Sequence, residues 1–325
     1  MNRKKVYVTR RIPNEAIKLL EKHFDVEINP RDRVLLKEEL LEKVKGKDAV
    51  LCLLSDNIDK DVFEAAGARC KIFANYGVPC DNIDITFATQ RGVIITNTPE
   101  VLDDATADLA WTLLMVVSRR IIAADRFTRN GAFESCDPMM FLGKKITGTT
   151  LGLVGAGSIG FNFAKKAKAF DMKVLYTDII RNYEMEKELG AIYVDKDTLL
   201  KEADFVSLHV PLLPSTTHYI SNREFSIMKN TSVIVNTCSG PVIDEKALVK
   251  ALKQGEIWGA GLDVFEHEPN IEPELLNMYN VVIVPHIASA IMETRTNMGL
   301  IAAQSIIKVL CGEELDSCVN IEVLK

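Results

Sequence analysis

The hydrophobic positions of the chain alternate between two spacings over nearly its whole length. Short apolar runs typical of strands are separated by stretches with an apolar residue every three or four positions, which is helical spacing. This alternation predicts βαβ units and parallel sheets. In the first hundred residues we expect strands at 5–9, 49–53, 71–74 and 93–96, and helices at 14–22, 37–44, 60–66 and 82–90.

One long helix is expected from about residue 99 to residue 129, with Pro99 in its first turn. Its segment 105–117 is apolar almost all round, which is typical of a buried helix. A second alternating series follows it. Strands are expected at 150–154, 173–176, 205–208, 232–236, 258–262 and 281–284, with helices at 161–170 and 289–310.

Composition narrows the classes of function. The chain has 325 residues, 47% of them hydrophobic, which is enough for two domains with substantial cores. A formal net charge of -6 disfavours a nucleic-acid partner, which usually requires a basic surface. No signal peptide is apparent, and no apolar run reaches about 18 residues, the length of a membrane span. We therefore expect a cytoplasmic protein without a membrane partner.

The cysteine pattern argues against a metal centre. The seven cysteines form no CxxC pair and no Cys/His cluster with the spacing of a zinc site. In a chain without a secretion signal, the odd count indicates reduced thiols that mostly fill the core. No metal site is expected.

A glycine-rich loop follows the strand expected at 150–154. Gly155, Gly157 and Gly160 form a GxGxxG motif between this strand and an amphipathic helix. The first glycine permits a tight turn, the second lets the backbone approach a pyrophosphate, and the third allows close packing of helix and strand. The N–H groups and positive dipole at the start of the helix attract phosphates. The context predicts a dinucleotide-binding loop.

An acidic residue completes this pattern. Asp178 follows the next strand, 18 residues beyond Gly160, where a carboxylate binds the ribose 2′-hydroxyl and repels the 2′-phosphate of NADP. An ordinary aspartate at a strand end is the alternative interpretation. The nearby Arg181 weakens the preference for NAD without reversing it. We predict NAD as the cofactor.

Further motifs extend over essentially the whole chain, from Val6 to Asn320. They include Asn75-Tyr76, Thr96-Asn97-Thr98-Pro99, Ala105–Trp111, His209-Val210-Pro211-Leu212, Gly261–Phe265, Glu268-Pro269 and Pro285-His286-Ile287. With these motifs, the chain resembles the D-2-hydroxyacid dehydrogenase family, and most closely its glyoxylate and hydroxypyruvate reductase branch. These motifs are together far more specific than the glycine loop alone.

The resemblance implies a two-domain α/β fold. Residues 1–98 and 293–325 would form a discontinuous, flavodoxin-like substrate domain. Residues 99–292 would form a Rossmann-type NAD-binding domain with a doubly wound parallel sheet, and the active site would lie in the cleft between the domains. The resemblance also implies a small-molecule substrate and a homodimer formed through the NAD-binding domain.

The resemblance assigns roles to individual residues as well. His286 would give the substrate oxygen its proton as hydride arrives, a task suited to a group that titrates near neutral pH. Glu268 would be its partner, favouring the charged imidazole and fixing its tautomer, with Glu266 as the residue it could be confused with. Cofactor contacts are implied for Gly155, Gly157, Ser158, Ile159, Gly160, Asp178, Val210, Pro211, Thr216, Thr237, Cys238, Asp263, His286 and Ser289, and substrate contacts for Leu54, Gly77, Val78 and Pro79.

Two positions depart from the family pattern, and both concern the substrate carboxylate. Ser239 occupies the position of the family's carboxylate-binding arginine, and serine lacks both the cation and the paired donors of a guanidinium. Pro79 replaces a glycine of a Val-Gly pair whose N–H groups bind the same carboxylate, and proline has no N–H. Because both substitutions affect groups that bind the same substrate carboxylate, we predict an altered substrate.

Two functions stay open at this stage. The first is an NAD-dependent oxidoreductase that transfers a hydride between the nicotinamide and a small hydroxy or keto compound, with an atypical carboxylate-binding site. The second is a catalytically impaired NAD(H)-binding sensor or corepressor-like scaffold. The glycine loop, Asp178, Asp263, Glu268 and His286 all persist, and this favours the enzyme.

Overall fold

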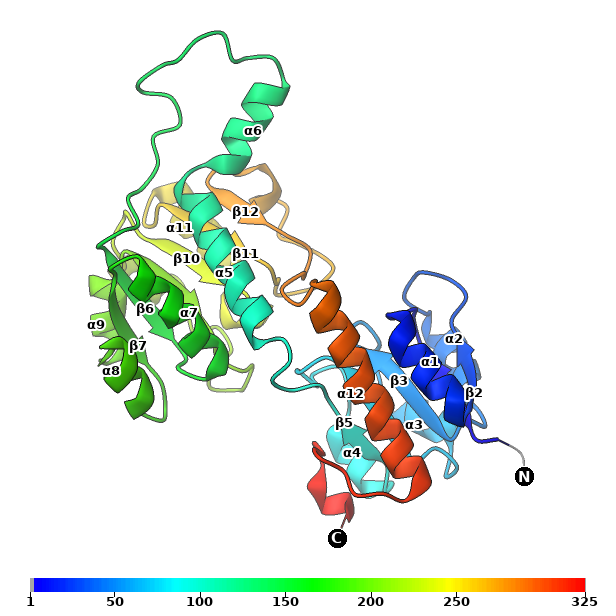
Figure 1. Ribbon diagram of the computed structural model, residues 1–325. Coiled ribbons are helices and arrows are strands. Elements are labelled where there is room, and N and C mark those ends of the chain that lie inside the picture. Colours follow the sequence, from blue (N-terminus) through cyan, green and yellow to red (C-terminus); the bar gives the residue numbers. More distant parts are fainter. Residues whose placement is uncertain (1–2, 325) are drawn as a thin grey trace. The chain divides into compact units, whose positions relative to one another are not determined.

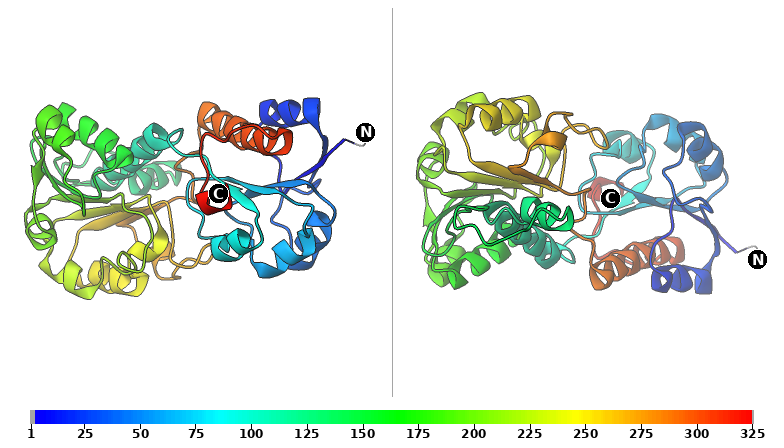
Figure 2. Two further views of the ribbon diagram at one scale, coloured as in Figure 1. Left: turned by 90° about the horizontal axis from the view of Figure 1, so that it is seen from below. Right: turned by 90° about the horizontal axis from the view of Figure 1, so that it is seen from above.

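The computed structural model describes residues 3–324, which divide into two compact units. Unit 2 is Asp103–Ala288, and unit 1 comprises the described residues on either side of it. Each unit contains its own parallel sheet with helices on both faces (Figures 1 and 2). The protein is therefore an α/β protein, as the alternating pattern predicts.

Within the described residues, unit 1 has a five-stranded sheet in the order β2-β1-β3-β4-β5, which is the flavodoxin-like order. Alternate residues of the central strand β3 (Ala49–Leu53) enter different cores, with Ala49 and Leu51 on one face and Val50 and Cys52 on the other. A strand buried on both faces is hydrophobic throughout, which explains the uninterrupted apolar run. The remaining elements are β1 Lys5–Val8, α1 Asn14–His23, β2 Asp25–Ile28, α2 Lys37–Val44, α3 Lys60–Ala66, β4 Ile72–Tyr76, α4 Ile85–Gln90, β5 Ile94–Thr96, α12 Met292–Cys311 and η3 Ile321–Leu324.

Within the described residues, unit 2 has a seven-stranded sheet in the order β12-β11-β10-β9-β6-β7-β8. Apart from the edge strand β12, this is the strand order of a Rossmann-type sheet. Helices α5 and α7 pack on one face, and α9, α10 and α11 on the other. The elements are α5 Asp103–Ser118, α6 Ile121–Arg129, β6 Thr150–Val154, α7 Ser158–Ala169, β7 Lys173–Thr177, α8 Tyr183–Leu189, β8 Ile192–Tyr193, α9 Lys196–Glu202, β9 Phe205–Leu208, α10 Asn222–Ile227, β10 Val233–Asn236, η1 Gly240–Val242, α11 Glu245–Gln254, β11 Gly259–Leu262, η2 Leu275–Asn277 and β12 Val281–Ile283.

The single helix predicted at 99–129 is wrong, because the structure contains two helices, α5 and α6, and Pro99 lies outside both. The carbonyl of Ser118 accepts a hydrogen bond from the N–H of Lys144, 2.8 Å away, and Arg120 adopts a left-handed φ of 53°. A contact from a distant segment thus replaces the continuing helical bond. Two short strands, β2 and β8, were also missed, because neither has a fully buried residue and their apolar pattern is weak.

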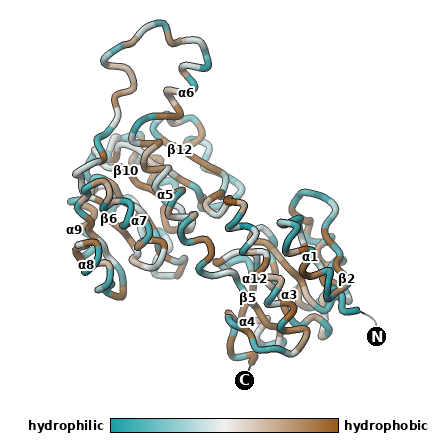
Figure 3. The backbone as a smooth tube through the Cα atoms, in the orientation of Figure 1, coloured by the Kyte–Doolittle hydropathy of each residue, from teal (hydrophilic) through white to brown (hydrophobic). Residues whose placement is uncertain are grey.

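A protruding segment, residues 121–142, leaves the body of unit 2 (Figure 1). This arm comprises α6 and the irregular chain that follows it. Hydrophobic and polar residues alternate along it in Figure 3, and Phe133, Met139 and Leu142 are each more than half exposed. No residue of α6 is buried. The arm therefore presents apolar side chains that the rest of unit 2 does not cover.

Candidate active site

The glycine loop joins β6 to α7 at the point where the strand order reverses, between β6 and β9. Gly155 has a φ of 99°, and a Cβ on it would lie 2.3 Å from the carbonyl oxygen of His209. A Cβ on Gly160 would lie 2.3 Å from the carbonyl oxygen of Gly155. Both positions require glycine, the first for its backbone conformation and both for close packing. These contacts fix the start of α7 against the ends of two strands.

Gly157 has a different surrounding. A Cβ on Gly157 would meet no atom within 4 Å, and Gly157 and Ser158 are exposed. Gly157 is also the N-cap of α7, so no side chain caps the N–H groups of the first turn, which contains Ser158, Ile159 and Gly160. This open space in front of uncapped N–H donors fits the pyrophosphate of a dinucleotide. The helix begins earlier than the sequence suggests because these residues form its first turn.

Asp178 is held beside this loop. Its Oδ2 accepts a hydrogen bond from the N–H of Ala156 at 2.6 Å, and its Oδ1 accepts one from the N–H of Ile180 at 3.2 Å. The side chain is half-buried at the end of β7. Each carboxylate oxygen keeps a further acceptor position, so the group can accept hydrogen bonds from hydroxyl groups.

The segment after β9 reaches the same loop. The N–H of His209 donates to the carbonyl of Val154 at 2.7 Å, which places Val210 next to Gly155. Thr216 closes the following turn, because its hydroxyl donates to the carbonyl of Pro211 at 2.6 Å and accepts from the N–H of Leu213 at 2.7 Å. Val210, Pro211 and Thr216 are therefore held by a defined turn at the carboxyl end of the sheet.

The segment after β10 contains Thr237, Cys238 and Ser239. Asn236 fixes this turn, since its Oδ1 accepts the N–H of Cys238 at 3.1 Å and its Nδ2 donates to the carbonyl of Ser239 at 2.8 Å. Within residues 3–324, the buried hydroxyl of Thr237 has no hydrogen-bond partner. Burial raises the pKa of the Cys238 thiol to about 11, so this cysteine is neutral and a poor nucleophile at neutral pH.

Asp263 organises the turn that carries the histidine. This aspartate is fully buried after β11, and its carboxylate accepts the N–H groups of Ile287 at 2.6 Å and Ala288 at 2.9 Å. Its carbonyl accepts the N–H of His286 at 2.9 Å. Burial raises the pKa of Asp263 above its ordinary value, while the two backbone donors oppose the shift. These bonds stabilise the left-handed conformation of His286, whose φ is 53°.

His286 and Glu268 lie in contact. Nδ1 of the imidazole is 2.8 Å from Oε2 of Glu268, whose Oε1 accepts the N–H of Phe265 at 3.0 Å. The His286 side chain is 42% exposed, so small molecules can reach it. Glu266 points elsewhere: its Oε1 lies 2.6 Å from Nε2 of His218. The structure thus distinguishes the two glutamates that the sequence leaves close together.

The substrate-contact residues expected before residue 100 cluster at the ends of the neighbouring strands β3 and β4 in unit 1. A Cβ on Gly77 would lie 2.6 Å from the side chain of Leu54, so these two positions are adjacent. The carbonyl of Val78 accepts from Nδ2 of Asn97 at 2.9 Å, and that of Pro79 accepts from Nδ2 of Asn75 at 2.7 Å. Ser289 also belongs to unit 1, and its carbonyl accepts a hydrogen bond from Arg295.

Sequence reasoning did not find the amide side chains that fix these turns. Asn75, Asn97, Asn182 and Asn236 each bond a backbone carbonyl within a turn near a strand end. An asparagine at or next to a strand end, or at a helix N-cap as for Asn182, is the signal that was available. The described residues contain no cluster of three potential metal ligands, and none of their helices has the length and apolarity to cross a bilayer.

The fold and the site define a dinucleotide-binding oxidoreductase. Residues 111–288 match the family model described as D-isomer specific 2-hydroxyacid dehydrogenase, NAD binding domain. The chain belongs to this family, and it is an NAD-dependent dehydrogenase that acts on a CH–OH group.

Known relatives cover the chain almost completely. It is 48% identical to the glyoxylate reductase of Thermococcus litoralis over 324 residues, which cover 98% of each chain. The glyoxylate reductase of Korarchaeum cryptofilum is also 48% identical, with 99% of this chain and 97% of the relative covered. Among solved structures, a glyoxylate reductase from Paecilomyes thermophila has a TM-score of 0.86 at 32% identity, covering 98% and 99% of the two chains. The TT0316 protein from Thermus thermophilus has a TM-score of 0.91 at 38% identity, covering 97% and 99%.

Proposed function

We propose that the protein transfers a hydride between NAD(H) and a small hydroxy or keto compound, with His286 as the group that donates or accepts the proton. The contact between His286 Nδ1 and Glu268 Oε2 at 2.8 Å carries this proposal. With Nδ1 on a carboxylate, the tautomer of the ring is fixed and Nε2 is the nitrogen assigned to the substrate oxygen. NAD supplies or accepts the hydride when bound.

The chain's own residues divide the remaining tasks. We assign the pyrophosphate to the first turn of α7, the ribose to Asp178, and support of the nicotinamide side to Asp263. Further cofactor contacts are proposed for Val210, Pro211, Thr216, Thr237, Cys238 and Ser289. We propose that residues 99–292 form the cofactor domain and that residues 1–98 with 293–325 form the substrate domain.

Substrate recognition is proposed to be atypical. Leu54, Gly77, Val78 and Pro79 are assigned to the substrate together with Ser239, which offers a hydroxyl in place of a cation. Two relatives of this chain at 48% identity are glyoxylate reductases, so glyoxylate is the reference substrate for the experiments.

The function is tested by incubating purified protein and NADH with a panel of 2-keto acids, aldehydes and ketones that includes glyoxylate. Loss of NADH absorbance with at least one compound, and weak turnover of glyoxylate, is the expected result. Saturable NADH binding without turnover of any compound would instead favour the sensor or scaffold function.

Replacing Glu268 with glutamine is expected to move the pH dependence of the reaction. Reduction requires a protonated imidazole, so its rate falls on the alkaline side of the profile. A neutral amide no longer favours the charged imidazole of His286, and the alkaline limb should shift to lower pH. The measurement is kcat/KM for carbonyl reduction against pH. An alkaline limb in the same place as in the wild type contradicts the pairing.

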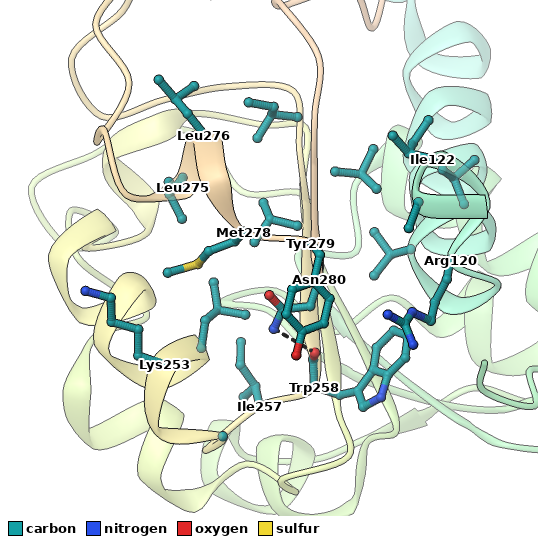
Figure 4. A pocket seen from close by; sticks show the side chains of 18 of the residues that line it. Arg120, Ile122, Lys253, Ile257, Trp258, Leu275, Leu276, Met278, Tyr279 and Asn280 are labelled. Atoms are coloured by element: carbon teal, nitrogen blue, oxygen red, sulfur yellow. Dashed lines mark hydrogen bonds between the residues drawn. The ribbon is translucent and has the colours of Figure 1, made fainter. Parts of the chain in front are cut away.

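We further propose that the protein forms a homodimer through unit 2. A cavity of about 840 Å³ lies between the end of α5, α6, β12 and the end of α11 (Figure 4). Tyr279 and Leu276 at its edge are 76% and 54% exposed, and Ile122 of the arm also lines it. A second copy would cover these apolar side chains together with the arm.

The dimer is tested by light scattering, which should give twice the 36.2 kDa mass of one chain. A monomer at micromolar concentration contradicts the proposal.

A cytoplasmic location is also proposed. All seven cysteines lie in the part of the chain that the structure describes, and each is a free thiol. Free thiols persist in a reducing compartment. Detection of the protein in a secreted or periplasmic fraction would contradict this location.

A further inference from the structure

Arg181 lies in the loop that carries Asp178, where an arginine can serve a 2′-phosphorylated cofactor. The loop joins β7 to α8, and the N–H of Ile180 donates to Asp178, so Arg181 lies three residues after the proposed ribose-binding position. A guanidinium matches a phosphate with paired donors and would favour NADPH. In the structure, however, the guanidinium of Arg181 has other partners.

The guanidinium of Arg181 is already engaged. Its Nε donates to Oε1 of Glu186 at 2.6 Å and a terminal nitrogen donates to Oε2 at 3.0 Å, which is a bidentate pair. The same group lies over the rings of Tyr183 and Tyr193, 5.2 and 5.8 Å from their centroids. Cation–π contacts and a paired carboxylate together hold the arginine in one orientation.

Glu186 is itself held in place by a hydrogen bond from a residue of the sheet core. The hydroxyl of Tyr176, a fully buried residue of β7, donates to Oε1 of Glu186 at 2.6 Å. Burial raises the pKa of Tyr176 to about 12, so the phenol stays a donor, and the bonds from Arg181 and Tyr176 lower the pKa of Glu186. An isolated surface ion pair contributes little to stability, but this pair has a buried anchor and belongs to a network.

The loop is tied to the glycine loop by a second set of contacts. The N–H of Asn182 donates to the Tyr176 hydroxyl at 3.0 Å, and Nδ2 of Asn182 donates to the carbonyl of Ala156 at 2.7 Å. Ala156 also donates its N–H to Asp178. Asp178 is therefore hydrogen-bonded to the glycine loop, and Arg181 is ion-paired with Glu186. These contacts hold the two side chains in fixed positions relative to each other.

We propose that Glu186, positioned by Tyr176, withholds Arg181 from the 2′ position of the cofactor and so contributes to the preference for NAD. Glu186 is a positioning residue that acts through Arg181. Selectivity then has two parts: Asp178 repels a 2′-phosphate, and Glu186 occupies the cation that would attract one. This inference rests on the proposed binding of the dinucleotide at the glycine loop.

The test measures dissociation constants for NADH and NADPH by fluorescence titration, without turnover. Wild type is expected to prefer NADH. Asp178→Asn removes the repelling charge while keeping an acceptor for Ala156, and Glu186→Gln keeps the bond from Tyr176 while releasing Arg181. The double variant should bind NADPH about tenfold more tightly than Asp178→Asn alone, because a charge-assisted bond to the phosphate becomes available. Its affinity for NADH should equal that of Asp178→Asn alone.

Arg181→Gln separates this role from a merely structural one. It should leave NADPH affinity unchanged in the wild type and abolish the gain in the double variant. Glu184→Gln is the matched control, because Glu184 is an exposed acid of the same helix, whereas the ion pair of Arg181 is with Glu186; it should leave NADPH affinity unchanged. The gain should also fall steeply with added salt, because it comes from a charge pair near the surface.

Two outcomes overturn the inference. One is a double variant that melts like the wild type and binds NADPH no better than Asp178→Asn. The other is an Arg181→Gln change that weakens NADPH binding equally in the wild type and the double variant, since Arg181 would then be available in both. A wild type that binds neither cofactor would instead refute the proposed function, on which this inference depends.

Discussion

Replacing His286 with asparagine is expected to reduce the turnover of any substrate by about 10²–10⁴-fold, the usual contribution of general acid–base catalysis. Asparagine can keep a hydrogen bond to Glu268 but cannot deliver a proton at neutral pH. The backbone N–H that bonds Asp263 is unchanged by the substitution, so the turn should persist. NADH affinity and the melting temperature should stay near the wild-type values, while kcat falls.

His218→Asn is the matched control for this experiment. His218 also lies on a carboxylate, 2.6 Å from Glu266, and it belongs to the same unit. The control variant should retain most of the turnover, because this pair is not assigned to the substrate. Equal losses in both variants would indicate a general effect on folding. Full activity of the His286 variant would mean that another group or water supplies the proton.

Ser239→Arg is expected to raise kcat/KM for glyoxylate by roughly tenfold, because it restores a charge-assisted pair to the carboxylate. Pro79→Gly should restore a backbone N–H and bring a further gain. Ser239→Gln is the control for size without charge, and Ser239→Lys is the control for charge without paired donors. Arginine should exceed lysine, and glutamine should bring little gain.

The double variant Ser239→Arg with Pro79→Gly shows whether the two positions serve one ligand. A shared carboxylate predicts a gain larger than the product of the two single gains, since coupled groups are not additive. NADH affinity and melting temperature are measured for each variant. A wild type that already reduces glyoxylate as rapidly as its relatives do would contradict the atypical site. A folded double variant with no gain would remove these two positions from the explanation of specificity.

Much of the fold was predictable because its strands are buried on both faces. The predicted strands at 49–53, 150–154 and 205–208 have the observed bounds of β3, β6 and β9. In a parallel sheet covered by helices, such strands are continuously apolar and stand out from the amphipathic segments between them. The edge strands β2 and β8 lack this burial, and the sequence did not reveal them.

The candidate site was less accessible to sequence reasoning. The motif positions indicate which residues to consider, and only the family resemblance, not their spacing, selects Glu268 over Glu266 as the partner of His286. The structure places Glu268 on the imidazole and Glu266 on His218, because the turn after β11 directs the two side chains to different neighbours. The partner of Arg181 was likewise hidden, since it depends on the position of α8.

By itself, the sequence determined the α/β class, the central strands and the position of the glycine loop. These features depend on local patterns: the period of apolar residues, and glycines where a left-handed φ or close packing excludes a Cβ. The tertiary structure decided where the helix after residue 102 breaks, because the N–H that bonds the Ser118 carbonyl comes from Lys144, far along the chain. It also decided which carboxylate holds Arg181. Those choices depend on segments brought together by packing, and no local pattern encodes them.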